Sequence, residues 1–174
     1  MLEDDDMDSD DDDEYVGPYD LNRQEAFEFG AHTIIIFKMK KHMNRNDIQL
    51  VCICCLTEMS KHTSIDTGST IRIIKAGGIE ATVNALNLHR DIEPLAVPAA
   101  SLLECLLYIP AEKEGNQHFV EFIERACTRL VEQHNIVSLI DYELSRNQDD
   151  ECLLLPYCHI LHSLTNRPNV LTKK

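Results

Sequence analysis

The sequence contains no tryptophan and few other aromatic residues, so its core has to be mostly aliphatic. Phe and Tyr make up 6% of the 174 residues, whereas 44% of the residues are hydrophobic, which is enough for a real core. Glycine and proline are also scarce, with six of each, and this scarcity excludes an all-β fold with many tight turns. We expect a single domain without strands.

The sequence also lacks a basic N-terminal signal peptide and an apolar run of the roughly 20 residues that span a bilayer. Its seven cysteines are odd in number, and Cys52, Cys54 and Cys55 are crowded together, which is typical of free thiols rather than of a disulfide framework. We therefore expect no membrane association, and a reducing compartment, the cytoplasm or the nucleus.

The net charge of −14 is concentrated at one end of the chain. Residues 1–20 contain eleven acidic residues and no basic one, which predicts a disordered acidic tail. A helical domain over residues 21–167 and a flexible C-terminus over residues 168–174 would follow. The tail repels phosphates, so nucleic acid is a disfavoured ligand. Ser9, which precedes four aspartates, resembles a site for acidophilic kinases; an unmodified solubilising tail is the alternative.

Apolar residues recur at three- to four-residue steps over most of the chain, which predicts a series of helices. The first helical pattern begins at about Glu25 and runs past Phe37. Pro98 is expected in the first turn of its helix, where proline is tolerated, and Pro156 inside the last helix. The later helices are predicted over about residues 48–60, 70–76, 79–88, 98–108, 119–131, 136–144 and 151–165.

Three sets of residues mark an internal repeat. The set Leu56, Leu103 and Leu161 recurs at sequence intervals of 47 and 58. The set Gly30, Gly77 and His134 recurs at intervals of 47 and 57, and the interval from Pro98 to Pro156 is again 58. These markers predict a unit of about 47 residues. The second copy is longer by about ten, and we place the extra length in the 108–118 loop and the helix after it.

The segment IIKAGGIEATVNAL, residues 73–86, resembles the armadillo family from its second helix through a small-residue turn into its third helix. The resemblance spans about residues 25–166 and is close only over residues 71–107. The sequence departs from the armadillo pattern at Gly30 and at His134-Asn135. The resemblance implies an all-α fold, a right-handed α-solenoid of stacked armadillo-like units. Its concave surface would be lined by third helices at about residues 33–43, 80–88 and 137–145.

Such folds bind other macromolecules and seldom catalyse reactions, because each unit contacts only its neighbours and leaves a long surface exposed. We therefore predict a non-catalytic protein-binding scaffold or adaptor with no cofactor. Its ligand would be a protein or a peptide, with an acidic one among the candidates. The predicted contact residues are Lys38, Lys41, Asn84, Asn87 and Tyr142.

The strongest basic cluster leaves two interpretations open. It comprises Lys38, Lys40, Lys41 and Arg45, and Arg72 and Lys75 add to it one unit later. It is either a solvated helix end whose cations complement the helix dipole, or a strip that binds an acidic peptide or a phosphate, the protein's own tail included.

Two alternative functions also remain. The predicted array begins with a third-helix-like segment and ends with a second-helix-like one, so both ends would expose apolar faces. The chain would then be one piece of a longer helical array or a self-associating unit. The other alternative is a thiol- or metal-dependent activity at the Cys52–Cys55 cluster, with Cys158, His159 and His162 as further ligands. It is disfavoured because these residues lie among Leu and Ile, and we predict no metal ligands. No phosphate loop, nucleophile elbow or metalloprotease motif is present, so no catalytic residue is predicted either.

Overall fold

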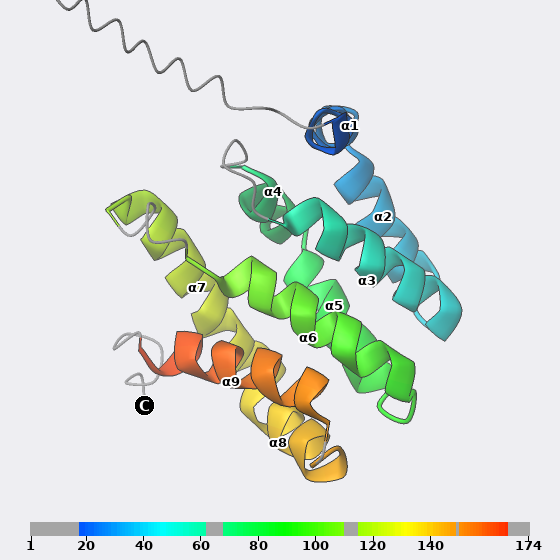
Figure 1. Cartoon of the computed structure of the whole chain (residues 1–174), viewed down its shortest axis with the longest axis vertical. Helices are drawn as coiled ribbons and strands as arrows, with labels where there is room; N and C mark the ends of the chain where they lie inside the picture. The colour runs from blue at the N-terminus through cyan, green and yellow to red at the C-terminus, as the bar shows by residue number, and fades with distance from the viewer. Residues whose placement is uncertain (1–17, 62–67, 110–114, 149, 167–174) are drawn as a thin grey trace, which may run out of the picture.

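The part of the chain that the structure describes consists of helices and the turns that connect them (Figure 1). The computed structural model describes residues 18–61, 68–109, 115–148 and 150–166 and contains no strand in these ranges. None of the helices in these ranges combines the length and the apolar character needed to cross a bilayer. The helices are α1 (Pro18–Glu28), α2 (Ala31–Lys41), α3 (Asn46–Ser60), α4 (Ser69–Lys75), α5 (Gly78–Leu88), α6 (Glu93–Leu107), α7 (Gln117–His134), α8 (Ile136–Arg146) and α9 (Glu151–Thr165).

Three helices, α3, α6 and α9, lie side by side across the molecule (Figure 1). α6 is in the middle, because it packs on both α3 and α9. A second set packs against the first: α2 contacts α3, α5 contacts α6, and α8 contacts α9. α4 and α7 lie towards the left of Figure 1, where α4 contacts α3, α5 and α6, and α7 contacts α5, α6 and α8.

The predicted spacing of the repeat is found in the helices. α3, α6 and α9 each contain 15 residues and begin at positions 46, 93 and 151. α2, α5 and α8 each contain 11 residues and begin at positions 31, 78 and 136. Both sets therefore recur at sequence intervals of 47 and then 58. The longer second interval comes from α7, which has 18 residues where α4 has 7.

A residue with a left-handed backbone precedes each helix of the second set. These residues are Gly30 with φ of 72°, Gly77 with φ of 90° and Asn135 with φ of 47°. Glycine adopts this conformation without a steric penalty, and asparagine tolerates it better than most residues. Asn135 is therefore the residue equivalent to Gly30 and Gly77. The sequence-based prediction, which made His134 the equivalent residue, was wrong by one position.

The core is aliphatic, as expected, and α6 contributes many of its residues. Small side chains on α6 let the neighbouring helices approach closely. The buried residues of α6 are Leu95, Ala96, Ala99, Ala100, Leu102, Leu103, Leu106 and Leu107. Between α2 and α3, buried Gln49 donates hydrogen bonds to the carbonyl oxygens of Met39 at 2.9 Å and His42 at 3.0 Å. It thereby satisfies the Met39 carbonyl group near the end of α2, and the His42 oxygen also accepts from the Arg45 N–H at 3.0 Å.

The chain becomes helical earlier than predicted. α1 begins at Pro18, three residues before the predicted start of the helical domain, and proline is well suited to a first turn. The rest of the predicted acidic tail, with Ser9, lies outside the described residues. So does the predicted flexible C-terminus, residues 168–174.

Two predictions about helix boundaries were wrong. The pattern from Glu25 past Phe37 is not one helix, because the chain turns at Gly30 between α1 and α2. Within α2, the side chain of Phe37 is 59% exposed, whereas its neighbour Ile36 is buried. Pro98 is not in a first turn either: α6 begins at Glu93, and Pro98 lies inside the helix.

Candidate ligand-binding groove between α4 and α7

A groove runs between α4 and the N-terminal two thirds of α7. It consists of two depressions that share Lys75, Phe122 and Arg125. The first has a volume of about 370 Å³, and the second has a volume of about 580 Å³. The first is also lined by Ile71, Asn116, His118 and Phe119, and the second by Ile74, Thr128 and Arg129.

α7 forms the longer wall of this groove. Its first turn is capped by the side chain of Asn116, whose Oδ1 accepts a hydrogen bond from the Phe119 N–H at 3.2 Å. The apolar stripe predicted for this helix is largely confirmed, with Phe122 and Val131 only half-buried. Its buried members are Phe119, Ile123, Ala126, Cys127 and Leu130. Because Phe122 flanks this stripe, its ring borders the groove rather than the centre of the core.

The charged side chains that line the groove are cationic. The Lys75 Nζ lies 5.8 Å from the centroid of the Phe122 ring, which is within the range of a cation–π contact. Arg129 forms an ion pair with Glu80 of α5, with 3.1 Å between Nη1 and Oε1. Arg125 is exposed, and no ion pair with it is found in the described ranges. No aspartate or glutamate is among the residues that line either depression.

This combination of groups suits a carboxylate or phosphate ligand with an apolar neighbour. A guanidinium presents a planar set of N–H donors that fits both oxygens of a carboxylate, and a lysine ammonium adds a mobile point charge. The Phe122 ring offers an apolar surface in the same two depressions as Lys75 and Arg125. The groove can therefore hold an anionic side chain and a hydrophobic group at the same time.

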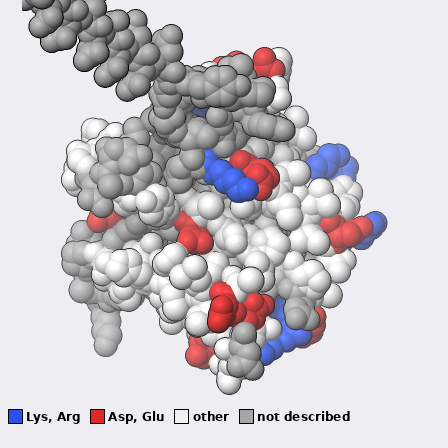
Figure 2. Space-filling view, viewed as in Figure 1, with Lys and Arg blue, Asp and Glu red and all other residues white. Residues whose placement is uncertain are grey.

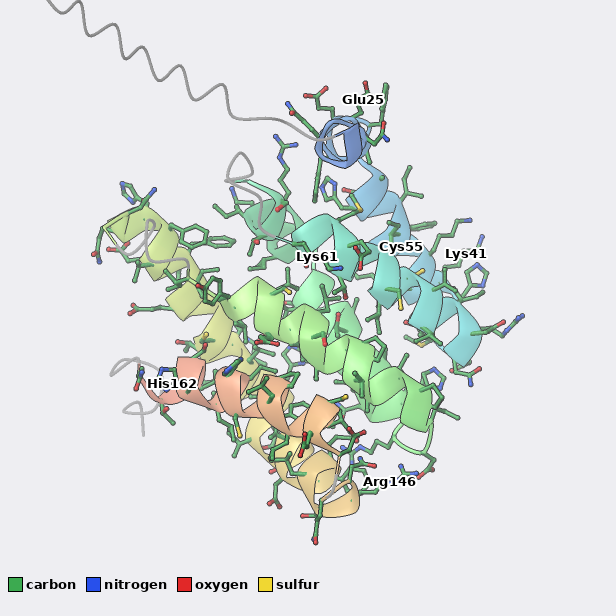
Figure 3. The ribbon with its side chains drawn as sticks, in the orientation of Figure 1. Glu25, Lys41, Cys55, Lys61, Arg146 and His162 are labelled. Carbon is green, nitrogen blue, oxygen red and sulfur yellow. The ribbon has the colours of Figure 1, made fainter. Side chains whose placement is uncertain are left out.

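Lys38, Lys41 and Asn84, three of the five contact residues predicted from the sequence, lie on α2 and α5. Lys38 and Lys41 are exposed on α2, and Figure 3 shows Lys41 at the right of the molecule, away from α7. Asn84 lines a depression of about 40 Å³ between α2 and α5. None of the three lines the groove between α4 and α7.

The other two predicted residues take part in contacts that join α5 to α8. The Asn87 side-chain oxygen accepts a hydrogen bond from the Arg90 guanidinium at 2.7 Å. Arg90 in turn lies over the Tyr142 ring, 5.3 Å from its centroid. Arg146 of α8 forms an ion pair with Asp91 at 3.7 Å, beside these residues. Asn87 and Tyr142 thus have partners within the protein.

The basic strip predicted around α2 is reduced by contacts within the fold. Lys40 points to the end of α4, where its Nζ lies 3.5 Å from the carbonyl oxygen of Ala76. Arg45 forms an ion pair with Asp47 at 2.7 Å. Of the strip residues on α2 itself, Lys38 and Lys41 are left without such a contact in the described ranges.

The fold separates the two halves of the proposed cysteine cluster. Cys52 and Cys55 are on α3, Cys158 and His159 are on α9, and α6 lies between these helices (Figures 1 and 3). His159 pairs instead with Glu104 of α6, with 2.5 Å between Nδ1 and Oε1. Burial raises the pKa of the Cys52 thiol, which disfavours the reactive thiolate. Among the described residues, no group of three or more His, Cys, Asp or Glu side chains is placed to hold a metal ion.

Sequence reasoning missed three residues of the groove, His118, Arg125 and Arg129. Together with Phe122 they are spaced by four, three and four residues along α7. This spacing places them on one side of the helix, next to its apolar stripe. The spacing was visible in the sequence, whereas the position of α4 opposite this side was not.

The chain matches no protein-family model, no curated protein and no solved structure.

Proposed function

We propose that this protein is a non-catalytic protein-binding module whose groove between α4 and α7 binds an acidic segment of a partner protein. The observation that carries this proposal is the composition of the groove lining, in which Lys75, Arg125 and Arg129 are present and acidic residues are absent among the lining side chains. Arginine, together with aromatic residues, is enriched where proteins recognise one another. An acidic segment with apolar residues interspersed matches this lining.

The architecture we propose is an α-solenoid of armadillo-like units. Two features support it. The helices of two sets recur at the same sequence intervals, 47 and then 58, and within the first set each helix packs on the next. In a solenoid each unit contacts only its neighbours, which leaves a long surface for a partner. The sequence resemblance to armadillo units over residues 71–107 points to the same architecture.

The sequence-based prediction placed the ligand on α2, α5 and α8, the third helices of the units. We favour the groove between α4 and α7 because it offers depressions of about 370 and 580 Å³. The depression between α2 and α5 measures about 40 Å³, which is too little for a side chain of a ligand to enter.

A direct test measures the binding of fluorescein-labelled hexaglutamate to the full chain by fluorescence anisotropy. We expect saturable binding that weakens as salt is added, because exposed ion pairs are screened. Replacing both Lys75 and Arg125 with alanine should weaken binding about tenfold, since each exposed charge pair contributes up to about 1 kcal/mol and 1.4 kcal/mol corresponds to a factor of ten. Measurements near physiological salt keep the repulsion from the acidic N-terminal residues small.

A matched double substitution separates this groove from the surface on α2. The variant with Lys38→Ala and Lys41→Ala loses the same charge as the groove variant and should bind hexaglutamate like the unmodified chain. Labelled hexaglutamine should not bind. The proposal is contradicted if the α2 variant loses affinity and the groove variant does not, or if a single-stranded DNA hexamer binds more tightly than hexaglutamate.

A further inference from the structure

The stack formed by α3, α6 and α9 has an exposed helix face at each end. The equivalent faces of the other helices in the stack are buried. Because the three helices have the same length, their residues can be compared position by position. Two contacts show how neighbours meet. Ser60 of α3 lies beside Cys105 of α6, and Glu104 of α6 pairs with His159 of α9.

The side of each helix that corresponds to Ser60 of α3 contains the fourth, eighth, eleventh and fifteenth residues of the helix. In α6 these residues are Ala96, Ala100, Leu103 and Leu107, and all of them are buried. The equivalent residues of α3 are buried as well. In α9 they are Leu154, Cys158, Leu161 and Thr165, and they are exposed or half-buried. We call this open surface of α9 the trailing face.

The opposite side of each helix, which corresponds to Cys105 of α6, contains the sixth residue, and the tenth residue borders this side. At the tenth position Leu102 of α6 and Ile160 of α9 are completely buried, whereas Cys55 of α3 is exposed. At the sixth position Val51 of α3 is 62% exposed and Pro156 of α9 is buried. We call this open surface of α3 the leading face.

The second set of helices ends in the same way. Ile34 of α2 is 57% exposed, although the equivalent residues of α5 and α8, Ala81 and Leu139, are buried. At the other end, Val137 of α8 is 45% exposed, although the equivalent residue of α5, Ile79, is buried. The leading face therefore extends onto α2, and the trailing face extends onto α8.

We infer that a second copy of this chain stacks head to tail, with the trailing face of one copy on the leading face of the next. The trailing face on α9 corresponds to the face with which α3 and α6 contact the next helix of the stack. The leading face on α3 corresponds to the face with which α6 and α9 contact the preceding helix. The contact would continue the packing that the molecule already uses between α3 and α6 and between α6 and α9. Large exposed apolar side chains that are grouped in this way mark interaction sites.

The two faces differ, so the contact joins unlike surfaces and leaves one face of each kind open in a dimer. Such a contact does not close on itself and produces growing chains unless the rotation between copies closes a ring. Figure 2 shows the side of the molecule formed by α3, α6 and α9, on which uncharged surface predominates between separate acidic and basic side chains; the two ends of the stack lie at the margins of this view. The ends lie on other helices than the groove between α4 and α7, so this inference does not depend on the proposed function.

Multi-angle light scattering and sedimentation of the full chain over a range of concentrations test the inference. The average mass should exceed the 19.9 kDa of one chain and rise with concentration. Val51→Glu closes the leading face and Leu154→Glu closes the trailing face, so each variant alone should stay at the mass of one chain. An equimolar mixture of the two variants should form dimers and nothing larger, because it contains one intact face of each kind.

The control is Leu88→Glu on α5, a side chain that is 51% exposed and belongs to neither face. It should associate like the unmodified chain, and circular dichroism should show the same helix content for all variants. A mass of one chain at every concentration would overturn the inference. So would association of either face variant alone, or a mixture of them that stays at the mass of one chain.

Discussion

Glycine is needed at the start of α5 for two different reasons. Gly77 has a φ of 90°, and a Cβ there would lie 3.0 Å from the Lys40 Nζ. Gly78 has no such backbone constraint, but a Cβ at this position would lie 2.5 Å from the Cγ2 of Ile73 and 3.0 Å from its carbonyl oxygen. Ile73 is fully buried, so its side chain has no free space to move into.

We therefore expect Gly78→Ala to lower the free energy of unfolding by about 2–3 kcal/mol, as overpacking in a core does. Gly30→Ala introduces only the backbone strain of φ 72°, because no atom lies within 4 Å of its Cβ position, and should cost about 1 kcal/mol. Gly115→Ala serves as the control, with open space and no unusual φ, and should change stability by less than about 0.5 kcal/mol. Urea unfolding measures all three; equal effects at the three positions would contradict this account of the turn.

Glu143 is a carboxyl buried between α8 and α9. Its side chain is 2% exposed, and burial raises its pKa although Arg146 and Arg90 act in the opposite direction. The Asn147 side chain lies 3.4 Å from its Oε2. Burial, and to a smaller extent Glu143, also raises the pKa of the Tyr157 hydroxyl. The folded chain thus favours the neutral form of Glu143.

A carboxyl with a raised pKa binds its proton in the folded chain at a pH where the unfolded chain has released it. Stability contributed by the neutral form is therefore lost as the pH rises from the ordinary value of 4.5 through the raised value. Glu143→Gln should increase the free energy of unfolding at pH 7, and the gain should vanish below about pH 4, where the carboxyl is protonated in both states. Unfolding curves between pH 4 and pH 7 measure this, with exposed Glu132→Gln as the control. A Gln variant that is less stable at pH 7 would show that Arg146 and Arg90 outweigh burial.

At the scale of elements, α6 holds the two sets of helices together. It packs on α3 and α9 in its own set, on α5 in the other set, and on α4 and α7. Truncation at its centre therefore leaves a cavity that several helices share. Leu103→Ala, at a side chain that is fully buried, should lower the free energy of unfolding by about 2–5 kcal/mol.

The matched substitution is Leu88→Ala on α5, which removes the same atoms from a side chain that is 51% exposed. It should change stability by less than about 0.5 kcal/mol. Thermal and denaturant unfolding, followed by circular dichroism, measure both variants. A comparable loss in the two variants would mean that α6 is not the central element of the fold.

The sequence predicted some helices almost residue by residue and misplaced others, for physical reasons. α9 was predicted over its observed range of 151–165, because Asp150 caps its start through the Cys152 N–H and its apolar pattern is strong. Gly30 was recognised as the equivalent of Gly77, but the helical pattern was nevertheless taken from Glu25 past it, because the apolar spacing continues across Gly30 with nearly unchanged phase. The start of α6 was misplaced because Pro98 sits inside the helix, where proline is uncommon.

The groove could not be predicted from the sequence, for a different reason. Its two walls come from the segments 71–75 and 116–129, which are far apart in the chain, and only the packing of α4 and α7 around α5 and α6 brings them together. The basic residues on α2 were predicted to bind a ligand because they lie close together in the sequence. The cations of α7 are separated by several residues, so their grouping follows only once the helix and its neighbours are placed.

At the scale of the whole molecule, the groove and the two ends of the stack use different surfaces. The groove lies along α4 and α7, whereas the leading face lies on α2 and α3 and the trailing face on α8 and α9. A partner bound in the groove therefore leaves both ends free. An array that grows by stacking would present one groove per copy and would hold a repetitive acidic partner by several weak contacts at once.

The central claim is that an acidic ligand binds between α4 and α7. The most direct test is a nuclear magnetic resonance titration of the isotopically labelled full chain with unlabelled hexaglutamate, which reports the location of binding as well as its strength. The account predicts that the amide signals of residues 71–75 and 118–129 shift together with the ring signals of Phe122, and that those of residues 31–41 and 78–88 stay in place. Shifts confined to α2 and α5, or no shifts at ligand concentrations that saturate the anisotropy signal, would contradict it.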